Sequence, residues 1–194
     1  MSEEEFAQAV VLDVLAHGRS DDDRPSYQRE PVCYVIASAD FQLYELTFEG
    51  PPPVAIGDVI EIEPLDAIEG AVDRETIGYG DLSSGARSEL DYVVEEILEN
   101  NEQHFVDFFN EAQPVSLRLH QLNLLPGIGD KIRDGILDTR KRGGPFNSFE
   151  DLEARVDGLH DPKGVLAERI LEELQEDEMK YYLFVGPDAL WVQQ

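Results

Sequence analysis

The first 80 residues alternate apolar and polar side chains with a period of two, which is the period of a half-buried β-strand. In the run 41–48, for example, the aromatic and aliphatic side chains fall on one face, while Glu45 and Thr47 fall on the other. Runs of this kind lie at residues 9–16, 31–37, 41–48, 56–62 and 74–79. Because an open sheet of short strands leaves unpaired edges, five strands predict a sheet that closes into a small barrel or folds into a sandwich.

The pattern changes at residue 83, where apolar residues begin to recur at the spacing of an α-helix. One such stripe is formed by Leu90, Val93, Val94, Ile97 and Leu98, and it continues through three phenylalanines that predict a helical core up to residue 112. Pro114 ends this run, and Ser116 stands where the N-cap of a further helix over 116–124 is expected. The last apolar run, residues 181–185, predicts a strand or an extended arm. The sequence therefore indicates an α+β protein with strands first and helices afterwards.

Residues 125–129, Leu-Pro-Gly-Ile-Gly, connect two predicted helices and form the most distinctive motif of the chain. The two glycines allow a tight backbone turn and the close approach of another molecule. Ile128 is placed to fill the gap between the two helices. The backbone amides at the start of the second helix point out of it, and with the helix dipole they form a pocket for an anion. Lys131, in the first turn of that helix, adds a positive charge beside the pocket.

A later segment repeats this pattern in a weaker form. Ser148 predicts the N-cap of a short helix, with Asp151 three residues further on. Residues 156–162, Val-Asp-Gly-Leu-His-Asp-Pro, then resemble the turn, but His160 replaces the second glycine. We therefore expect the second hairpin to pack rather than to bind. Two such hairpins in tandem are similar to the helix-hairpin-helix arrangement that grips a nucleic-acid backbone.

The chain is strongly acidic, with 42 Asp and Glu against 15 Lys and Arg and a net charge of −27. Its hydrophobic fraction of 42% is too high for a disordered acidic tail. The acid is spread along the chain, as in proteins of halophilic archaea, and we expect it to destabilise the fold at low salt, where repulsion is not screened. Residues 115–145 are the exception, because six basic and three acidic side chains give them a net charge of +3. This positive stretch favours a binding site for a polyanion.

The sequence lacks the motifs of the common enzyme and metal-site classes. Cys33 is the single cysteine, which excludes a disulfide scaffold and a multi-cysteine zinc site. The four histidines show no metal-ligand spacing, and neither a phosphate-binding loop nor a nucleophile elbow occurs. We expect no catalytic residue, no metal and no cofactor. The first residues are acidic and no run approaches the roughly 18 apolar residues of a membrane helix, so we expect a cytoplasmic protein without membrane contact.

The whole arrangement resembles the archaeal domain-of-unknown-function family 655. The turn and strand over 57–62 are similar to those of small OB and S1-like barrels, and the tandem hairpins follow further along the chain. The resemblance implies an OB-like β-barrel over 1–80, a helical linker over 81–114, a tandem helix-hairpin-helix domain over 115–178, and a C-terminal strand or arm over 179–194. It also implies a protein that binds RNA or nucleotides.

The leading hypothesis is a non-enzymatic protein that holds RNA, in preference to DNA, through the first hairpin, with the ribosome or another ribonucleoprotein particle as its partner. The expected backbone contacts are Gly127, Ile128, Gly129, Lys131, Arg133, Arg140, Lys141 and Arg142. The candidate base-stacking residues are Tyr34, Tyr44 and Phe48. Two alternatives stay open. One is a DNA-binding accessory factor in repair or replication, since backbone contacts carry no base information. The other is an acidic scaffold that contacts basic protein partners and uses the hairpin only as architecture.

Overall fold

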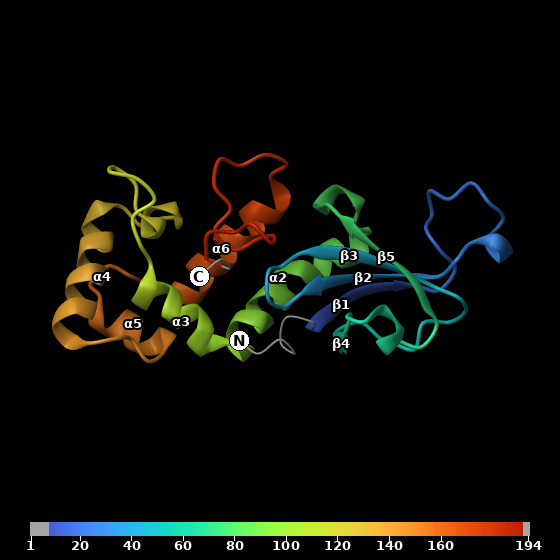
Figure 1. Cartoon of the computed structure of the whole chain (residues 1–194), viewed down its shortest axis with the longest axis horizontal. Coiled ribbons are helices and arrows are strands. Elements are labelled where there is room, and N and C mark those ends of the chain that lie inside the picture. Colours follow the sequence, from blue (N-terminus) through green and yellow to red (C-terminus); the bar gives the residue numbers. More distant parts are fainter. Residues whose placement is uncertain (1–7, 192–194) are drawn as a thin grey trace. The chain divides into compact units, whose positions relative to one another are not determined.

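The computed structural model describes residues 8–191 of the chain. These residues divide into two compact units. The first contains residues up to 93 together with 185–188, and the second contains 94–184 together with 189–191. The predicted α+β class is confirmed, because a five-stranded antiparallel sheet comes first and five α-helices follow it in the described chain (Figure 1).

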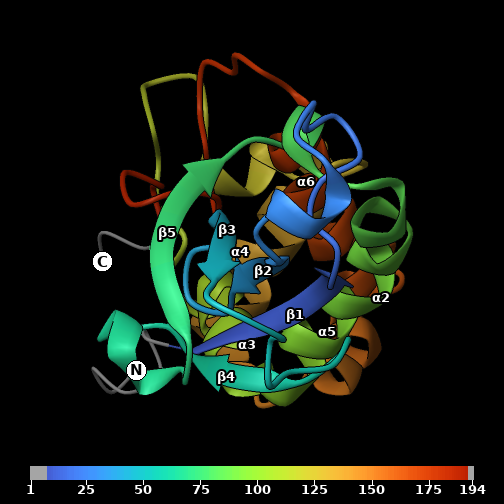
Figure 2. The same ribbon diagram turned by 90° about the vertical axis from the view of Figure 1, so that its right-hand side faces the viewer.

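The first unit is built on one sheet. Its strands are β1 (Gln8–Leu15), β2 (Val32–Ala37), β3 (Leu43–Phe48), β4 (Val59–Glu61) and β5 (Ala71–Ile77), and its short 3-10 segments are η1 (Ser26–Gln28), η2 (Leu65–Ala67) and η3 (Tyr79–Asp81). The strands lie in the order β4-β1-β2-β3-β5. The register shifts between Val11 and Asp13 in β1, and again in β3, where it pairs with β5. Such irregularities bend a strand, and β5 is visibly curved (Figure 2).

The sheet has two edges, β4 and β5. Within the described residues no ladder joins these two strands, so the predicted closure is not made by strand pairing. An arginine bridges them instead. Arg74 on β5 donates one hydrogen bond to the carbonyl oxygen of Ile62 and another to the carboxylate of Glu63, each at 2.7 Å. A charged side chain at a sheet edge discourages pairing with other chains.

The core of this unit lies against one face of the sheet. It contains Ala9, Val11, Cys33, Val35, Leu46, Phe48, Ile62 and Ile68. The strand β2 is buried along its whole length, so both faces of the sheet are covered at that position. This explains why Glu45, on the face opposite Leu46 and Phe48, is only 7% exposed. Arg19 lies 3.6 Å from its carboxylate and balances its charge.

The second unit is helical. The helix α2 (Ser84–Asn100) begins in the first unit and ends in the second, which also contains α3 (Glu102–Glu111), the 3-10 segment η4 (Gln121–Leu124), α4 (Asp130–Gly143), α5 (Phe149–Arg155) and α6 (Pro162–Gln175). The phenylalanines of α3 are buried, as their spacing predicted. Phe108 packs edge to face against Phe184 and Trp191, with ring centroids 5.1 and 5.5 Å apart.

The predicted helix over 116–124 is wrong. The amides of Val115 and Ser116 both donate to the carbonyl oxygen of Leu119, which closes a tight turn instead of a helical one. Only the 3-10 segment η4 follows. Residues 181–185 were predicted to form either a strand or an extended arm, and they form the arm. They are irregular, and their carbonyl oxygens accept the amides of Leu190 and Trp191.

Candidate nucleic-acid interface

The turn before α4 has the geometry that its two glycines permit. Gly127 has a φ of 74°, in the left-handed region that favours glycine. The amide of Ile128 donates to the carbonyl oxygen of Leu125 at 3.3 Å, and the Ile128 side chain is buried. Gly129 is the N-cap of α4 and offers no side chain to its amides. No capping side chain accepts the first backbone N–H groups of α4, and uncapped amides of this kind can bind an anion, although Asp130 adds a negative charge in the same turn.

The same turn recurs 31 residues later, before α6. Gly158 has a φ of 83°, and the amide of Leu159 donates to the carbonyl oxygen of Val156, again at 3.3 Å. The two turns differ at the helix that follows. The carboxylate of Asp161 accepts a hydrogen bond from the amide of Gly164 at 3.1 Å and so caps α6 with its own negative charge. The amino terminus of α6 is capped by Asp161, whereas no N-cap side chain caps the amino terminus of α4, which we call open.

The two basic residues in the first turn of α4 have different surroundings. Lys131 is exposed and, within residues 8–191, forms no ion pair. Arg133 lies 2.9 Å from the carboxylate of Asp130 and 3.0 Å from that of Asp134, and it also donates to the side-chain oxygen of Asn123 at 3.1 Å. Its charge is balanced by two carboxylates, so Arg133 is less available to a phosphate than Lys131 is.

The basic residues at the end of α4 also divide into two kinds. Arg140 donates to the carbonyl oxygens of Phe109 and Ala112 at 2.9 and 3.1 Å, and it thereby satisfies the last turn of α3. Burial lowers the pKa of Arg140. Lys141 and Arg142 are exposed, and no ion pair holds either of them within the described chain. Arg140 is therefore a structural residue, and only its two neighbours remain available to a ligand.

The aromatic side chains predicted to stack on bases are largely inaccessible. Tyr34 is 3% exposed and Phe48 is 1% exposed, because both belong to the covered faces of the sheet. Burial raises the pKa of Tyr34 to about 12, with the nearby carboxylate of Glu45 adding to the effect. Tyr44 is half-buried, and the guanidinium of Arg74 lies 5.3 Å from the centre of its ring. Tyr34 and Phe48 are core residues, and the structure does not support stacking at either.

Two polar residues that the sequence analysis missed hold the turn in place. His120 accepts a hydrogen bond at Nδ1 from the amide of Leu122 at 3.1 Å, and burial lowers its pKa, which keeps this nitrogen an acceptor. Asn123 donates to the carbonyl oxygen of Ile128 at 3.4 Å. A histidine and an asparagine three residues apart are common in any sequence, so no pattern distinguished them.

A buried ion pair on α6 also stabilises the segment that leads into the turn. Arg169 donates to the carbonyl oxygen of Leu124, just before the turn, at 3.0 Å and to that of Tyr181 at 2.7 Å. Glu173, one helical turn later, accepts the amides of Leu183 and Phe184. Arg169 and Glu173 lie among apolar residues at helical spacing, and charged residues at core positions are the indication that could have revealed them.

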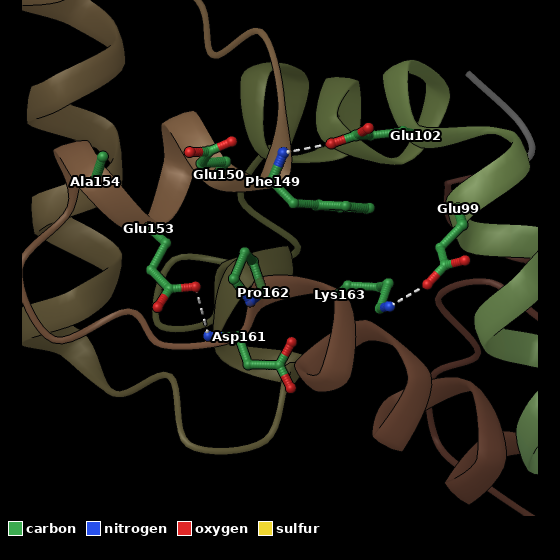
Figure 3. Close-up of a pocket in the computed structure, with 9 residues that line it drawn as sticks. All are labelled: Glu99, Glu102, Phe149, Glu150, Glu153, Ala154, Asp161, Pro162 and Lys163. Atoms are coloured by element: carbon green, nitrogen blue, oxygen red, sulfur yellow. Dashed lines mark hydrogen bonds and ion pairs between the residues drawn. The ribbon is translucent and has the colours of Figure 1, made fainter.

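The second unit also contains an acidic pocket of about 610 Å³ (Figure 3). It is lined by Glu99, Glu102, Phe149, Glu150, Glu153, Ala154, Asp161, Pro162 and Lys163. Several of the carboxylates already have structural partners. Glu99 lies 2.5 Å from Lys163, Glu102 accepts the amide of Phe149 at 2.9 Å, and Glu153 accepts that of Asp161 at 3.2 Å. A polyanion would be repelled here, so the pocket is not part of the candidate interface.

Within 8–191, no group of three or more His, Cys, Asp or Glu side chains is arranged to hold a metal ion. In the same part of the chain no helix is both long and apolar enough to cross a membrane.

The fold is that of an α+β protein with a sheet followed by a helical unit, and comparison with known proteins identifies the family. Residues 5–186 match the model described as "Protein of unknown function (DUF655)", and the chain belongs to this family. A relative named "Uncharacterized protein MJ0038", from Methanocaldococcus jannaschii, is 37% identical over 180 residues, which is 91% of this chain and 78% of the relative. The crystal structure of Af1531 from Archaeoglobus fulgidus is similar with a TM-score of 0.82 and 35% identity, covering 93% of this chain and 99% of that one.

Proposed function

We propose that this protein is a non-enzymatic RNA-binding protein that holds the sugar–phosphate backbone at the turn before α4. The observation that carries the proposal is the open amino terminus of α4. Gly129 brings no side chain to it, and Lys131 stands beside it without a carboxylate partner among the described residues. A phosphate oxygen can accept hydrogen bonds from these amides and an ion pair from the lysine.

The surrounding architecture supports this proposal. Two turns with left-handed glycines, at Gly127 and Gly158, are what a tandem helix-hairpin-helix domain contains. The strand order β4-β1-β2-β3-β5 is that of an OB barrel with its last seam unpaired, and OB barrels are a common support for nucleic-acid binding. We therefore assign the first unit to an OB-like domain and the second to tandem hairpins.

The net charge of −27 agrees with this mode of binding. Affinity that comes from counterion release falls steeply as salt rises. Hydrogen bonds from fixed amides depend on direction more than on net charge. A protein adapted to high salt can therefore bind RNA while most of its surface is acidic, provided that the contact is made by backbone amides with a few cations, here Lys131, Lys141 and Arg142.

The experiment combines Gly129→Asp with Lys131→Glu. A Cβ at Gly129 would meet no atom within 4 Å, and an aspartate there can cap α4 as Asp161 caps α6, so the variant should fold. We expect it to lose at least about tenfold in affinity for a structured RNA, measured by fluorescence anisotropy at several KCl concentrations. The matched control carries Gly80→Asp and Arg24→Glu, which change the charge equally at exposed positions in the first unit, which does not contain the turn.

Unchanged affinity of the double variant would refute the proposed interface. The same assay with duplex DNA of equal length tests whether the 2′-hydroxyls contribute, because these groups distinguish RNA from DNA. Tighter binding to DNA would favour the role in repair or replication. A crosslinked pulldown from a high-salt lysate would then identify the bound particle, and we expect ribosomal or other ribonucleoprotein RNA to be lost in the variant.

A further inference from the structure

A short finger precedes the turn, over residues 114–120. Its base is an antiparallel bridge between Pro114 and His120. Its tip is closed by the carbonyl oxygen of Leu119, which accepts the amides of Val115 and Ser116 at 2.7 and 3.0 Å. Hydrogen bonds therefore join the two sides of the finger, and residues 116–118 form its tip.

The tip of the finger exposes an apolar side chain to water. Leu117 is 106% exposed, the highest value among the exposed large apolar residues of the described chain. Arg118 beside it is also exposed and has no ion pair within residues 8–191. Burying a leucine side chain in a partner is favourable. An exposed leucine with a neighbouring cation has the chemistry to insert into an apolar space that lies next to a negative charge.

Hydrogen bonds connect the finger to the turn. The amide of His120 donates to the side-chain oxygen of Asn123 at 3.4 Å, and the side-chain nitrogen of Asn123 donates to the carbonyl oxygen of Ile128 at 3.4 Å. The base of the finger and the Gly127–Gly129 turn are therefore linked through one asparagine. An RNA strand whose backbone contacts the turn would therefore pass close to the base of the finger.

We propose that Leu117 inserts between two bases of the RNA that the turn holds, while Arg118 contacts the adjoining phosphate. This inference rests on the proposed function and adds a substrate class to it, namely RNA with a bulged or unpaired nucleotide. Apolar side chains wedge between base steps in other nucleic-acid complexes, and an unpaired step costs less to open than a stacked pair. A stacked apolar contact also keeps its strength when salt screens charges.

The test places a fluorophore at the tip with Leu117→Trp. Trp191 is the only natural tryptophan and is 5% exposed, so its emission is a constant background. Titration with a bulged RNA hairpin should quench the emission of the Leu117→Trp protein, because indoles are quenched when they stack on bases. The control is Tyr27→Trp, at a residue that is 83% exposed and lies in the other unit, and its emission should not change.

A second variant, Leu117→Ala, completes the test. We expect this variant to lose about fivefold in affinity for the bulged RNA and less than twofold for a fully paired RNA of equal length, as measured by anisotropy. RNA that binds without quenching the Leu117→Trp emission, and equally well to Leu117→Ala, would overturn the wedge and leave the proposed function intact. Failure of the natural protein to bind either RNA would refute the proposed function itself, and the wedge with it. A change in emission caused by a basic protein but not by RNA would assign the leucine to a protein partner and overturn the wedge.

Discussion

Replacing the buried carboxyl Glu173 by glutamine should change how the stability of the protein depends on pH. Burial raises the pKa of Glu173 from its ordinary value near 4.5 to about 7, although the amides of Leu183 and Phe184 and the charge of Arg169 oppose that effect. Between these pH values the folded protein holds a proton that the unfolded chain has released. The stability that this group contributes is therefore complete below about pH 4.5 and is lost as the pH rises to about 7.

The size of the effect follows from the width of this interval. At about 1.4 kcal/mol per pH unit, the free energy of unfolding should fall by roughly 3 kcal/mol through Glu173 alone. Glu173→Gln keeps an oxygen that can accept the amides of Leu183 and Phe184 but does not titrate. Relative to the natural protein, the variant should gain that roughly 3 kcal/mol between about pH 4.5 and 7.

The measurement is urea unfolding at constant molar KCl, because guanidinium would itself change the ionic strength. The control is Glu172→Gln, which removes the same charge from an exposed neighbour on α6. Parallel pH profiles for Glu173→Gln and the natural protein would refute the reasoning, since they would mean that the buried carboxyl titrates alike in the folded and the unfolded chain.

Two further predictions concern α4 and its turn. Arg140→Met should lower the free energy of unfolding by about 2 kcal/mol through its two lost carbonyl contacts, with little effect on RNA affinity at conditions where the protein is folded. Lys141→Met should do the reverse, and a loss of affinity without a loss of stability in Arg140→Met would contradict the assignment. Gly127→Ala should destabilise by about 1 kcal/mol through its left-handed backbone alone, because the new methyl group meets no atom within 4 Å. The comparable Gly80→Ala should cost little by the same thermal or urea unfolding, since that glycine also has open space but not a positive φ.

Much of the fold could be predicted because local pattern and tertiary packing agree. The runs that became β1, β2 and β3 are rich in β-branched and aromatic residues, and the stripe on α2 repeats over several turns. The turn at residues 125–129 was visible because a left-handed position requires glycine. The helix over 116–124 was predicted wrongly because Ser116, following Pro114, looks like a helix N-cap. The bonds that close the turn at Leu119 and the bridge at Pro114 form only in the folded chain and have no sequence pattern of their own.

The candidate site was harder to predict than the fold, since a basic side chain is available to a ligand only if no group of the protein already pairs with it. Arg133 and Arg140 look equivalent to Lys131 and Lys141 in the sequence. Their partners, two carboxylates in one case and the last carbonyls of α3 in the other, come from the folded helix and from a segment 28 or more residues away. The aromatic residues predicted to stack on bases were misjudged in the same way. The sequence pattern along β2 cannot show that both faces of the sheet are covered, and so it could not reveal that these side chains are buried.

The carboxylate of Asp161 has a consequence for stoichiometry. A chain with two equivalent open turns could hold two backbone segments, and so crosslink or compact the nucleic acid to which it bound. Its own aspartate caps the helix after the second turn, so under the proposed function only the first turn is free to hold a backbone segment. The protein should then titrate RNA at one strand per chain and should not crosslink two strands.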